Sequence, residues 1–554
     1  AYDYKGHPVI IQNKRTGTDD QLWNIALVSG KIYKVTSKVN KLAVTGSGSA
    51  AGQLTTYAGL VSQQWGFNEL PASDTTKASS FKVTNAFQNN MVVQRDKPFR
   101  IWGTASPSAL VSVKASWNGS VISAQTDDSG KWLVTIPAAA ANAAPQTLVA
   151  SVSGQPAVTL NNILIGDVWL CSGQSNMVMP VDSVSPFYGF EGVINYQAEI
   201  AAANYPQIRA VTIGYSLVSN LQADVTGKNP WIVCSPTKAS AGTISAVSYF
   251  FGRKLNTTLN VPIGLVISAA SGTYAEQWVS KETLQNDPKI AVYNNLNKND
   301  ATKLYNGMIY PLRNLSLKGV IWYQGENNRD DQPVTNYAYL SAAQIKSWRE
   351  LFNQGQLPFY YVQMTPLAGS FFATNPWGDN PVANDYAFFR EAQSFIRAVP
   401  GTGMAVTLDC GELIKIHPRI KKPIGERLAL LALQNDYGQN VQSIGPQYQS
   451  FTQSSNTVTI SFKPGTADGL KRSDNRALGQ YFFVAGTDKK FRQGVATLSG
   501  NQVIITVPNG TPLPVQAVRY AFTNFPMDCN VTNAAGLPME PFRSDTYTDR
   551  ITSL

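Results

Sequence analysis

The chain has 554 residues, which is too long for one hydrophobic core and predicts three or four domains. Its formal net charge is +10, but the basic residues are scattered and clusters such as Lys421-Lys422 are short. We therefore expect a solvated basic surface and no nucleic-acid partner. The sequence contains no apolar run of about 18 residues, so no membrane span is expected. Because the first residue is Ala1 rather than Met, we expect a processed product whose targeting peptide has been removed.

Residues 1–70 carry an internal repeat. Gln21-Leu-Trp23 and Gln63-Gln-Trp65 are Q-x-W triplets 42 residues apart, and the short strands around them predict a partial β-trefoil. The triplets resemble the ricin-type lectin family, whose trefoils have three repeats where this chain has one and a half. We therefore expect an upstream fragment or a second chain to complete the domain. The strand Leu42-Ala-Val44 lacks the carboxylate that this lectin family uses, so core packing of the Trp residues is favoured over sugar binding.

Two further regions have the pattern of β-domains. After a polar linker at 71–80, residues 81–160 alternate apolar and polar side chains, and Asp127-Asp-Ser-Gly130 is typical of a hairpin turn. This pattern predicts a β-sandwich. Alternation returns in residues 440–554 and predicts a C-terminal β-rich domain.

Between these regions, residues 161–437 alternate apolar strands with helical stretches, which predicts a parallel α/β sheet. Such sheets place their functional sites at the carboxyl ends of the strands. The expected strands are 163–170, 208–212, 263–267, 319–324, 359–363 and 404–408. The clearest helices are expected at 247–255, 337–352 and 424–434.

The first of these strands leads into a candidate nucleophile. The segment 163–177 reads as a buried strand, a tight turn permitted by Gly173, and a helix that begins near Ser175. A hydroxyl at that position projects from the strand end, and free helix N–H groups can stabilise developing negative charge beside it. A serine after a glycine also fits an ordinary loop, so the other strand ends must decide.

Three later strand ends carry suitable partners. They are Ser268-Ala-Ala-Ser-Gly-Thr273, which contains Gly272, then Gln324-Gly-Glu-Asn-Asn328, and the segment 408–418, which contains His417. Serine needs a base, and histidine is the side chain best matched to neutral pH. The chain has only two histidines. Because His7 lies in a different module, His417 is the one plausible imidazole base.

Three blocks now resemble a known family. Leu170-Cys-Ser-Gly-Gln-Ser-Asn-Met177, Trp322-Tyr-Gln-Gly-Glu326 and Ile416-His-Pro418 are similar to the signature blocks of the sialate O-acetylesterase family, within the SGNH (GDSL-like) hydrolases. Segments near 90–103 and 529–543 are similar to that family's leading and closing parts. The resemblance implies a flavodoxin-like, three-layer α/β hydrolase domain flanked by β-sandwich modules, with no metal or organic cofactor.

The resemblance also implies an acyl-transfer mechanism. Ser175 attacks an acetyl carbonyl, and His417 takes its proton and later delivers it to the departing sugar oxygen. The backbone N–H groups of Ser175 and Gly272 form the oxyanion hole with a side-chain amide from Gln324 or Asn327.

The acid of the triad and the substrate contacts are less clear from the sequence. SGNH enzymes commonly place an Asp three residues before the histidine, where this chain has Ile414. Glu412 is the first candidate acid, with Asp409 or a backbone carbonyl as alternatives. The residues expected to line the sugar pocket are Glu276, Trp278 and Glu326, although core packing explains Trp278 equally well.

The sequons permit a secreted glycoprotein without demonstrating one, and the cysteines leave the disulfide pairing open. Cys171, Cys234, Cys410 and Cys529 have no C-x-x-C spacing, so we expect no zinc site, and they allow three complete disulfide pairings. Candidate glycosylation sites are Asn118, Asn256, Asn314, Asn509 and Asn530.

The sequence therefore predicts a secreted or lysosomal carbohydrate O-acetylesterase that acts on sialic acid or another glycan. The alternative is a lectin-like adhesion or structural glycoprotein that keeps the hydrolase fold without its chemistry. The incomplete trefoil and Ile414 favour the alternative, whereas Ser175, His417 and the 324–328 turn favour the enzyme.

Overall fold

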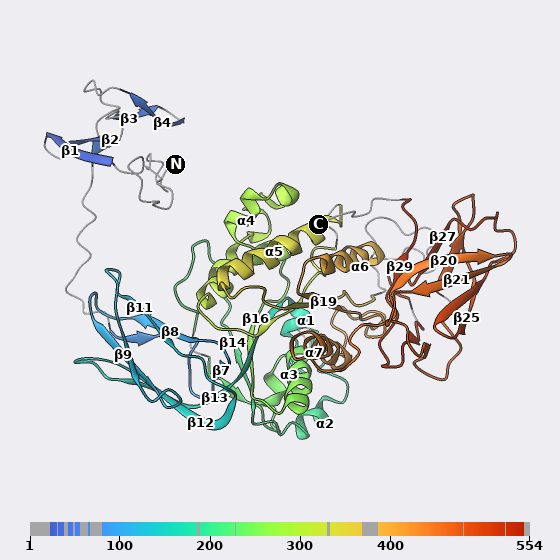
Figure 1. Cartoon of the computed structure of the whole chain (residues 1–554), viewed down its shortest axis with the longest axis horizontal. Coiled ribbons are helices and arrows are strands. Elements are labelled where there is room, and N and C mark those ends of the chain that lie inside the picture. Colours follow the sequence, from blue (N-terminus) through green and yellow to red (C-terminus); the bar gives the residue numbers. More distant parts are fainter. Residues whose placement is uncertain are drawn as a thin grey trace. The chain divides into compact units, whose positions relative to one another are not determined.

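The structure is a computed structural model of the whole chain (Figure 1). It describes five strands between residues 23 and 66, and then residues 80–547 except 185–188, 228, 330–332, 368–385, 480 and 527. The chain divides into two compact units, Ala1–Ala78 and Ser79–Leu554.

The first unit contains a five-stranded sheet. Its strands are β1 (Trp23–Ser29), β2 (Ile32–Ser37), β3 (Ala43–Ser47), β4 (Ala50–Thr55) and β5 (Trp65–Gly66). They pair in the order β1-β2-β3-β4, with β5 on β2, and every pairing is antiparallel. The short strands expected here are confirmed, but a trefoil is not shown and stays a prediction. His7, Gln21 and most of the expected linker lie outside the described residues.

The second unit is built on a parallel sheet whose central strand is β13 (Val158–Gly173). Its parallel strands run in the order β14-β16-β13-β17-β18-β19, and the short strand β15 (Ile232–Val233) pairs antiparallel with β14 at one edge. The other five strands are β14 (Ile208–Thr212), β16 (Ile263–Ala269), β17 (Gly319–Tyr323), β18 (Phe359–Val362) and β19 (Thr402–Ala405). All six expected strands are present, although β19 begins and ends earlier than expected.

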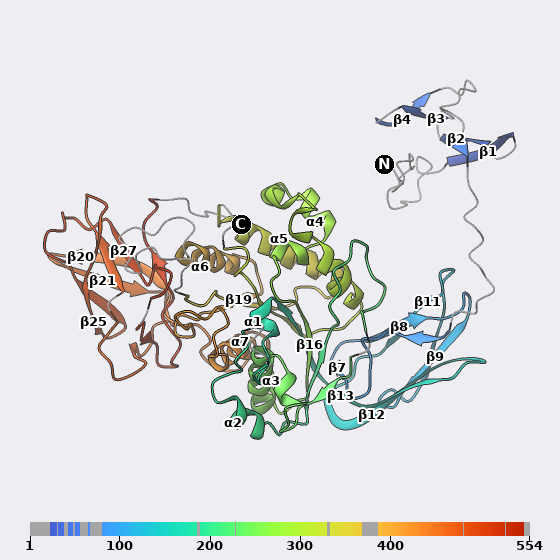
Figure 2. The same cartoon turned by 180° about the vertical axis from the view of Figure 1, so that it is seen from behind.

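Helices cover both faces of this sheet, as Figures 1 and 2 show. One face carries α3 (Ala246–Leu259) and α7 (Lys422–Asp436), and the other carries α5 (Asn336–Phe352) and α6 (Tyr386–Phe395). Side chains of β13 alternate between the two layers: Trp169 and Cys171 belong to the core with α3 and α7, whereas Val168 and Leu170 belong to the core with α5 and α6. This alternation explains why the strand reads as a continuous apolar run.

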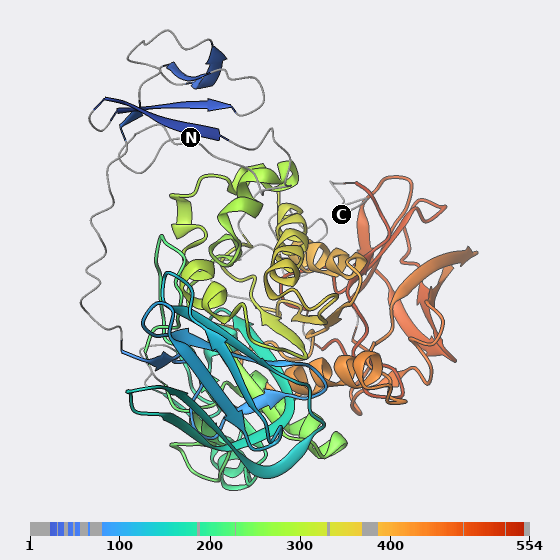
Figure 3. The same ribbon diagram turned by 60° about the vertical axis from the view of Figure 1, so that its left-hand side comes forward.

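Strand β13 also extends into a second set of strands. Its amino half pairs antiparallel with β12 (Asn142–Val152), which continues to β9 (Leu110–Ala115) and β10 (Val121–Gln125). A three-stranded sheet, β11-β8-β6, is formed by Lys131–Ile136, Phe99–Thr104 and Lys82–Val83 (Figure 3). The expected boundary between residues 160 and 161 therefore falls inside one continuous strand, and the predicted sandwich stays a prediction.

The carboxyl-terminal part is rich in strands, as the alternation predicted. One four-stranded sheet follows the order β20-β21-β26-β25 and the other the order β24-β23-β27-β29. Their strands are Tyr448–Ser454, Thr457–Phe462, Gln502–Thr506, Val495–Ser499, Phe491–Gln493, Phe482–Ala485, Ala517–Tyr520 and Phe542–Arg543. These sheets extend away from the parallel sheet beyond α7 and α6 (Figure 1).

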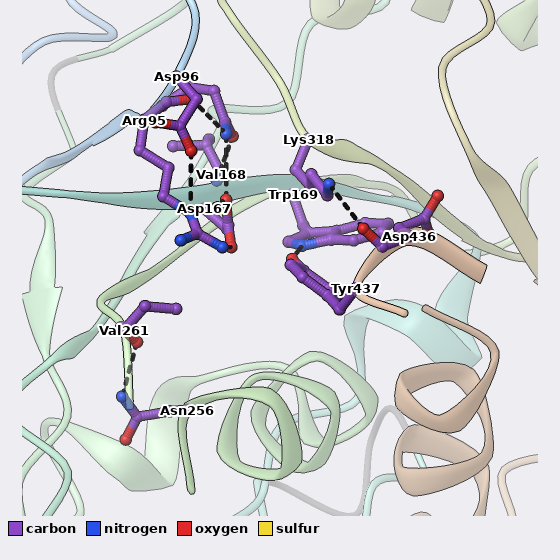
Figure 4. A network of polar contacts seen from close by, with 11 residues as sticks. Arg95, Asp96, Asp167, Val168, Trp169, Asn256, Val261, Lys318, Asp436 and Tyr437 are labelled. Carbon is purple, nitrogen blue, oxygen red and sulfur yellow. Dashed lines mark hydrogen bonds and ion pairs between the residues drawn. The ribbon is translucent and has the colours of Figure 1, made fainter. Parts of the chain in front are cut away.

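A polar network fixes the middle of β13 (Figure 4). The Arg95 guanidinium donates to both carboxylate oxygens of Asp167, at 3.0 and 2.9 Å, and Asp167 is buried. Two residues further along, the Trp169 indole donates to the hydroxyl of Tyr437 at 3.3 Å, just beyond α7. A buried ion pair is costly to break because it would leave an uncompensated charge. The network therefore opposes any slip of the strand in register.

Candidate active site

The turn after β13 presents Ser175 at the start of a short helix, α1 (Ser175–Val178). Gly173 ends the strand with a φ of 140°, and a Cβ at this position would lie 2.1 Å from the carbonyl oxygen of Tyr323. Only glycine fits such a close approach of two parallel strands. Ser175 is 6% exposed, so its hydroxyl lies at the edge of the packed interior.

Asn176 joins this turn to the loop that carries His417. Its side-chain amide donates to the carbonyl oxygen of Ile416 at 3.0 Å. The residue after Ser175 is therefore bonded to the residue before His417. The bond joins the turn that carries Ser175 to the loop that carries His417, and the pairing of their two side chains stays a prediction.

The His417 ring is half-buried and faces a backbone group. A Cβ built on Gly189 would lie 3.5 Å from His417 Nδ1, and Phe190 packs edge-on at 4.9 Å between ring centroids. Burial, and then the charge of Lys421, lower the pKa of His417 to about 4 against the opposing effect of a backbone hydrogen bond to Gly189. That bond favours the protonated ring, so the Gly189 carbonyl accepts from it.

Neither candidate acid contacts His417. Both oxygens of the Glu412 carboxylate face Arg419, accepting from its backbone N–H at 2.6 Å and from its guanidinium at 2.9 Å. Burial raises the pKa of Glu412, but these bonds and the charge of Arg419 outweigh it and hold the pKa below its usual range. Asp409 forms an ion pair with Arg427 at 2.6 Å. The assignment of Glu412 as the acid is not supported, because its charge is already neutralised elsewhere.

Asn327 lies beside the nucleophile turn. Gln174 donates to the side-chain oxygen of Asn327 at 3.2 Å, and Asn327 Nδ2 donates to the carbonyl oxygen of Gly272 at 2.9 Å. Gly272 is exposed and has a φ of 70°. The ends of β13, β16 and β17 therefore meet through Gln174 and Asn327, which leaves one hydrogen of the Asn327 amide for a further acceptor.

The side-chain amide of Gln324 uses both of its hydrogens inside the protein, which corrects its assignment to the oxyanion hole. It is 1% exposed, and its amide donates to Thr273 O at 3.1 Å and to Asn328 Oδ1 at 2.7 Å. Its side-chain oxygen accepts from the hydroxyl of Tyr337 at 2.9 Å. An amide with both hydrogens bonded inside the protein cannot also serve a substrate.

Comparisons with known proteins identify the family of this chain. A family model described as a carbohydrate esterase, sialic acid-specific acetylesterase, matches residues 165–384. Sialate O-acetylesterases from Mus musculus and Homo sapiens are 28% and 27% identical, over 83% and 85% of this chain and 94% of each relative. The crystal structure of a carbohydrate acetylesterase from Xanthomonas citri has a TM-score of 0.73 and 33% identity, and the match covers 84% of this chain and 100% of that one. The chain belongs to the sialate O-acetylesterase family of carbohydrate esterases.

Within this esterase, the residues expected to line the sugar pocket face the interior. Trp278 has no accessible surface, and its indole donates to Thr273 Oγ1 at 3.1 Å. Glu276 is 3% exposed and accepts from Asn299 and Asn328, while Glu326 is 2% exposed and accepts from Asn176. The side chains of these three residues are buried and bonded within the protein, so this structure gives no support for their assignment to substrate binding, which stays a prediction.

Two residues of the site were missed from the sequence. Asn176 lies inside the first signature block, so its proximity to Ser175 was a usable signal. Lys421 has no accessible surface, although the sequence treated it as part of a short surface cluster. Nothing in the pair Lys421-Lys422 distinguishes the buried residue from its exposed neighbour.

The cysteines and two of the sequons also differ from expectation. All four cysteines carry free thiols, so the expected disulfides are not formed. Asn530 is 1% exposed, and its amide donates to Asp474 and Ala477, which leaves no room for a glycan. The amide of Asn256 donates to Val261 at 2.8 Å (Figure 4). It also donates to Gln207 at 3.2 Å. The sequons at Asn118, Asn314 and Asn509 stay predictions.

Proposed function

We propose that this esterase hydrolyses acetyl esters on sialic acid or another glycan, with Ser175 as nucleophile and His417 as base. The observation that carries the proposal is the bond from Asn176 to Ile416, which places the nucleophile turn against the histidine loop. The family relationship supports the same chemistry.

The reaction has two steps. In the first, Ser175 Oγ attacks the acetyl carbonyl while His417 Nε2 accepts the hydroxyl proton and passes it to the departing sugar oxygen. In the second, His417 takes a proton from water, the resulting hydroxide attacks the acetyl-serine, and acetate leaves as Ser175 regains its proton. A neutral imidazole is required at the start, and the lowered pKa of His417 keeps the ring neutral across the ordinary pH range.

The developing oxyanion needs hydrogen-bond donors, and the three strand ends offer candidate N–H groups. We assign this role to the backbone N–H groups of Ser175 and Gly272 and to the amide of Asn327. Asn327 is oriented by Gln174 on one side and by the Gly272 carbonyl on the other, so its remaining hydrogen is held in place before substrate arrives. A preorganised donor of this kind is worth about 3 kcal/mol in the transition state.

His417 is then oriented by a backbone carbonyl rather than by a carboxylate. The Gly189 carbonyl fixes Nδ1 as the protonated nitrogen and leaves Nε2 as the base. We therefore assign a Ser–His dyad to this esterase.

The proposal is tested by acetate release from O-acetylated sialic acid and from an O-acetylated polysaccharide. We expect Ser175→Ala and His417→Ala each to abolish the release, and a fluorophosphonate probe to label the wild-type protein and not Ser175→Ala. Unchanged activity in either variant, or no labelling of the wild type, would instead favour an inactive glycan-binding protein.

The location of the esterase is also a proposal. In the part of the chain that the structure describes, no helix combines the length and apolar character needed to cross a membrane. We propose a secreted or lysosomal enzyme, which N-linked glycan at Asn509, an exposed sequon, would support. Mass spectrometry of the intact native protein would show such a glycan, together with any second chain that completes the N-terminal repeat.

A further inference from the structure

The side chain of Asn176 connects the three signature blocks of the sequence. It belongs to the first block, its Nδ2 donates to Glu326 Oε1 in the second, and the same nitrogen donates to Ile416 O in the third at 3.0 Å. Its Oδ1 accepts from Lys421 Nζ at 2.5 Å. Both hydrogens and the oxygen of the Asn176 amide are therefore bonded to groups outside the Ser175 turn.

Lys421 brings a cation into this interior. The side chain has no accessible surface and lies 5.0 Å from the centroid of the Tyr323 ring. Burial lowers the pKa of Lys421 to about 7, against the opposing charges of Glu326, Cys410 and Glu412. Burying an ammonium group is costly, so packing alone does not explain why Lys421 is buried next to the Ser175 turn.

Glu326 brings an opposite charge into the same network, because it is bonded to the same Asn176 amide. It is 2% exposed, and burial raises the pKa of Glu326 despite the hydrogen bond from Asn176 and the charges of Lys421 and Arg329. Its Oε2 has no hydrogen-bond partner among the described residues. The charged form of this carboxylate is favoured first by hydrogen bonds, to its own backbone and from Asn176, and then by the charges of Lys421 and Arg329.

The charge of Lys421 also acts on the catalytic ring. After burial, it is the second cause that lowers the pKa of His417. The groups that face His417 are the Phe190 ring, the Gly189 backbone and Lys421. Lys421 in turn faces the side chains of Glu326, Tyr323, Cys410, Glu412 and Asn176. The same cation therefore fixes Asn176 and favours the neutral imidazole.

We propose that Lys421 is a positioning residue of this esterase, holding the Ser175 turn against the His417 loop through Asn176, with Glu326 as its buried counter-charge. This inference rests on the proposed Ser175–His417 mechanism. Lys421 touches no substrate, so its contribution is to the geometry of the dyad and to the charge state of the base.

The test compares Lys421→Met with Lys422→Met. Lys422 is the exposed neighbouring residue, so both variants lose one positive charge one residue apart. We expect Lys421→Met to lower kcat about 100-fold with little change in KM, because a nucleophile and base displaced by about 1 Å lose about that much rate. Lys422→Met should match the wild type.

The pH profile separates positioning by a charge from simple packing. Without the cation, the acid limb of kcat/KM should move to higher pH by about one unit, since removing a nearby like charge raises the pKa of a histidine. Lys421→Arg, which keeps the charge, should leave the limb where the wild type has it. If the kcat/KM of Lys421→Met falls at the same acid pH as that of the wild type, the inference is overturned and Lys421 has only a packing role.

Two further measurements keep the test decisive. If Lys421→Met does not fold, the double variant Lys421→Met with Glu326→Gln removes both buried charges, and it should show the same shifted limb. If that protein also fails to fold, the test relies on Lys421→Arg. A reduced kcat with the acid limb of kcat/KM at its wild-type pH supports the inference, and a wild-type kcat overturns it. Loss of activity in Ser175→Ala beside an unaffected Lys421→Met would refute this inference alone, whereas an active Ser175→Ala would refute the function itself.

Discussion

The two halves of the proposed catalytic pair come from segments of opposite character. Ser175 follows a 16-residue strand at the centre of the sheet, and its turn is fixed by one glycine that packs against Tyr323. His417 lies on an irregular loop after β19, held by side-chain and backbone contacts from Gly189, Asn176 and Phe190. The nucleophile is therefore placed by local backbone geometry, whereas the base is placed by long-range contacts. Substitutions near Ser175 and near His417 should consequently affect activity in different ways.

The largest effect is expected from Gly173→Ala. The added Cβ would meet the Tyr323 carbonyl at 2.1 Å in a backbone conformation that disfavours side chains, so β13 and β17 must separate. We expect activity to fall by about 100-fold or more, because the serine moves with the strand end. Stability should fall by about 3 kcal/mol in chemical denaturation. A fully active, equally stable variant would show that the turn is not fixed in this way.

The next effect concerns pH and tests the base. His417 must be neutral to accept a proton, and burial lowers its pKa to about 4. As the pH falls through that value the ring becomes protonated, so kcat/KM should be level between pH 5 and 7. Below about pH 4 it should fall roughly tenfold per unit. A limb near pH 6.5, measured with a soluble acetyl ester, would mean that the loop does not shield the ring.

A smaller loss is expected from Phe190→Ala. The ring packs edge-on against His417 at 4.9 Å, a contact worth about 1 kcal/mol. We expect kcat to fall about fivefold and the acid limb to move to higher pH, because the imidazole becomes better solvated. Phe491→Ala, which removes a buried ring from the carboxyl-terminal sheets, is the control for general destabilisation and should leave the limb unchanged.

The smallest effect is expected from Glu412→Gln. Removing the acid of a true triad can cost about four orders of magnitude in rate. Because Glu412 is bonded to Arg419, we expect its replacement to loosen the loop and to lower kcat by less than about tenfold. A loss near that of His417→Ala in acetate release would restore Glu412 as the acid and remove the Gly189 carbonyl from that role.

The same contrast explains how far the sequence could predict the molecule. The continuous apolar run around Trp169 and the glycine before Ser175 identify the strand and its turn, because both follow from local periodicity and sterics. By contrast, the strand expected at 404–408 lies at Thr402–Ala405, and the partner of His417 was left open among three groups. Gly189 is 228 residues from His417, and no local pattern encodes such a pairing.

The burial of individual polar residues was equally hard to read. Glu276 and Glu326 were expected to line the sugar pocket, yet both are buried and held by asparagine amides from distant segments. Lys421 and Lys422 look alike in sequence, and only the contact with Asn176 tells them apart. Buried polar networks depend on tertiary partners, so they are absent from single-residue propensities.

The length of β13 has a consequence for how this esterase can be divided or altered. The family match begins at residue 165, within the strand, so a boundary drawn there would sever hydrogen bonds to β12 and leave β16 and β17 with a truncated partner. A one-residue insertion in the strand would turn one half of its side chains to the wrong faces. The β12 arm and the parallel sheet should therefore melt together in one transition, and neither can be exchanged between relatives as a separate module.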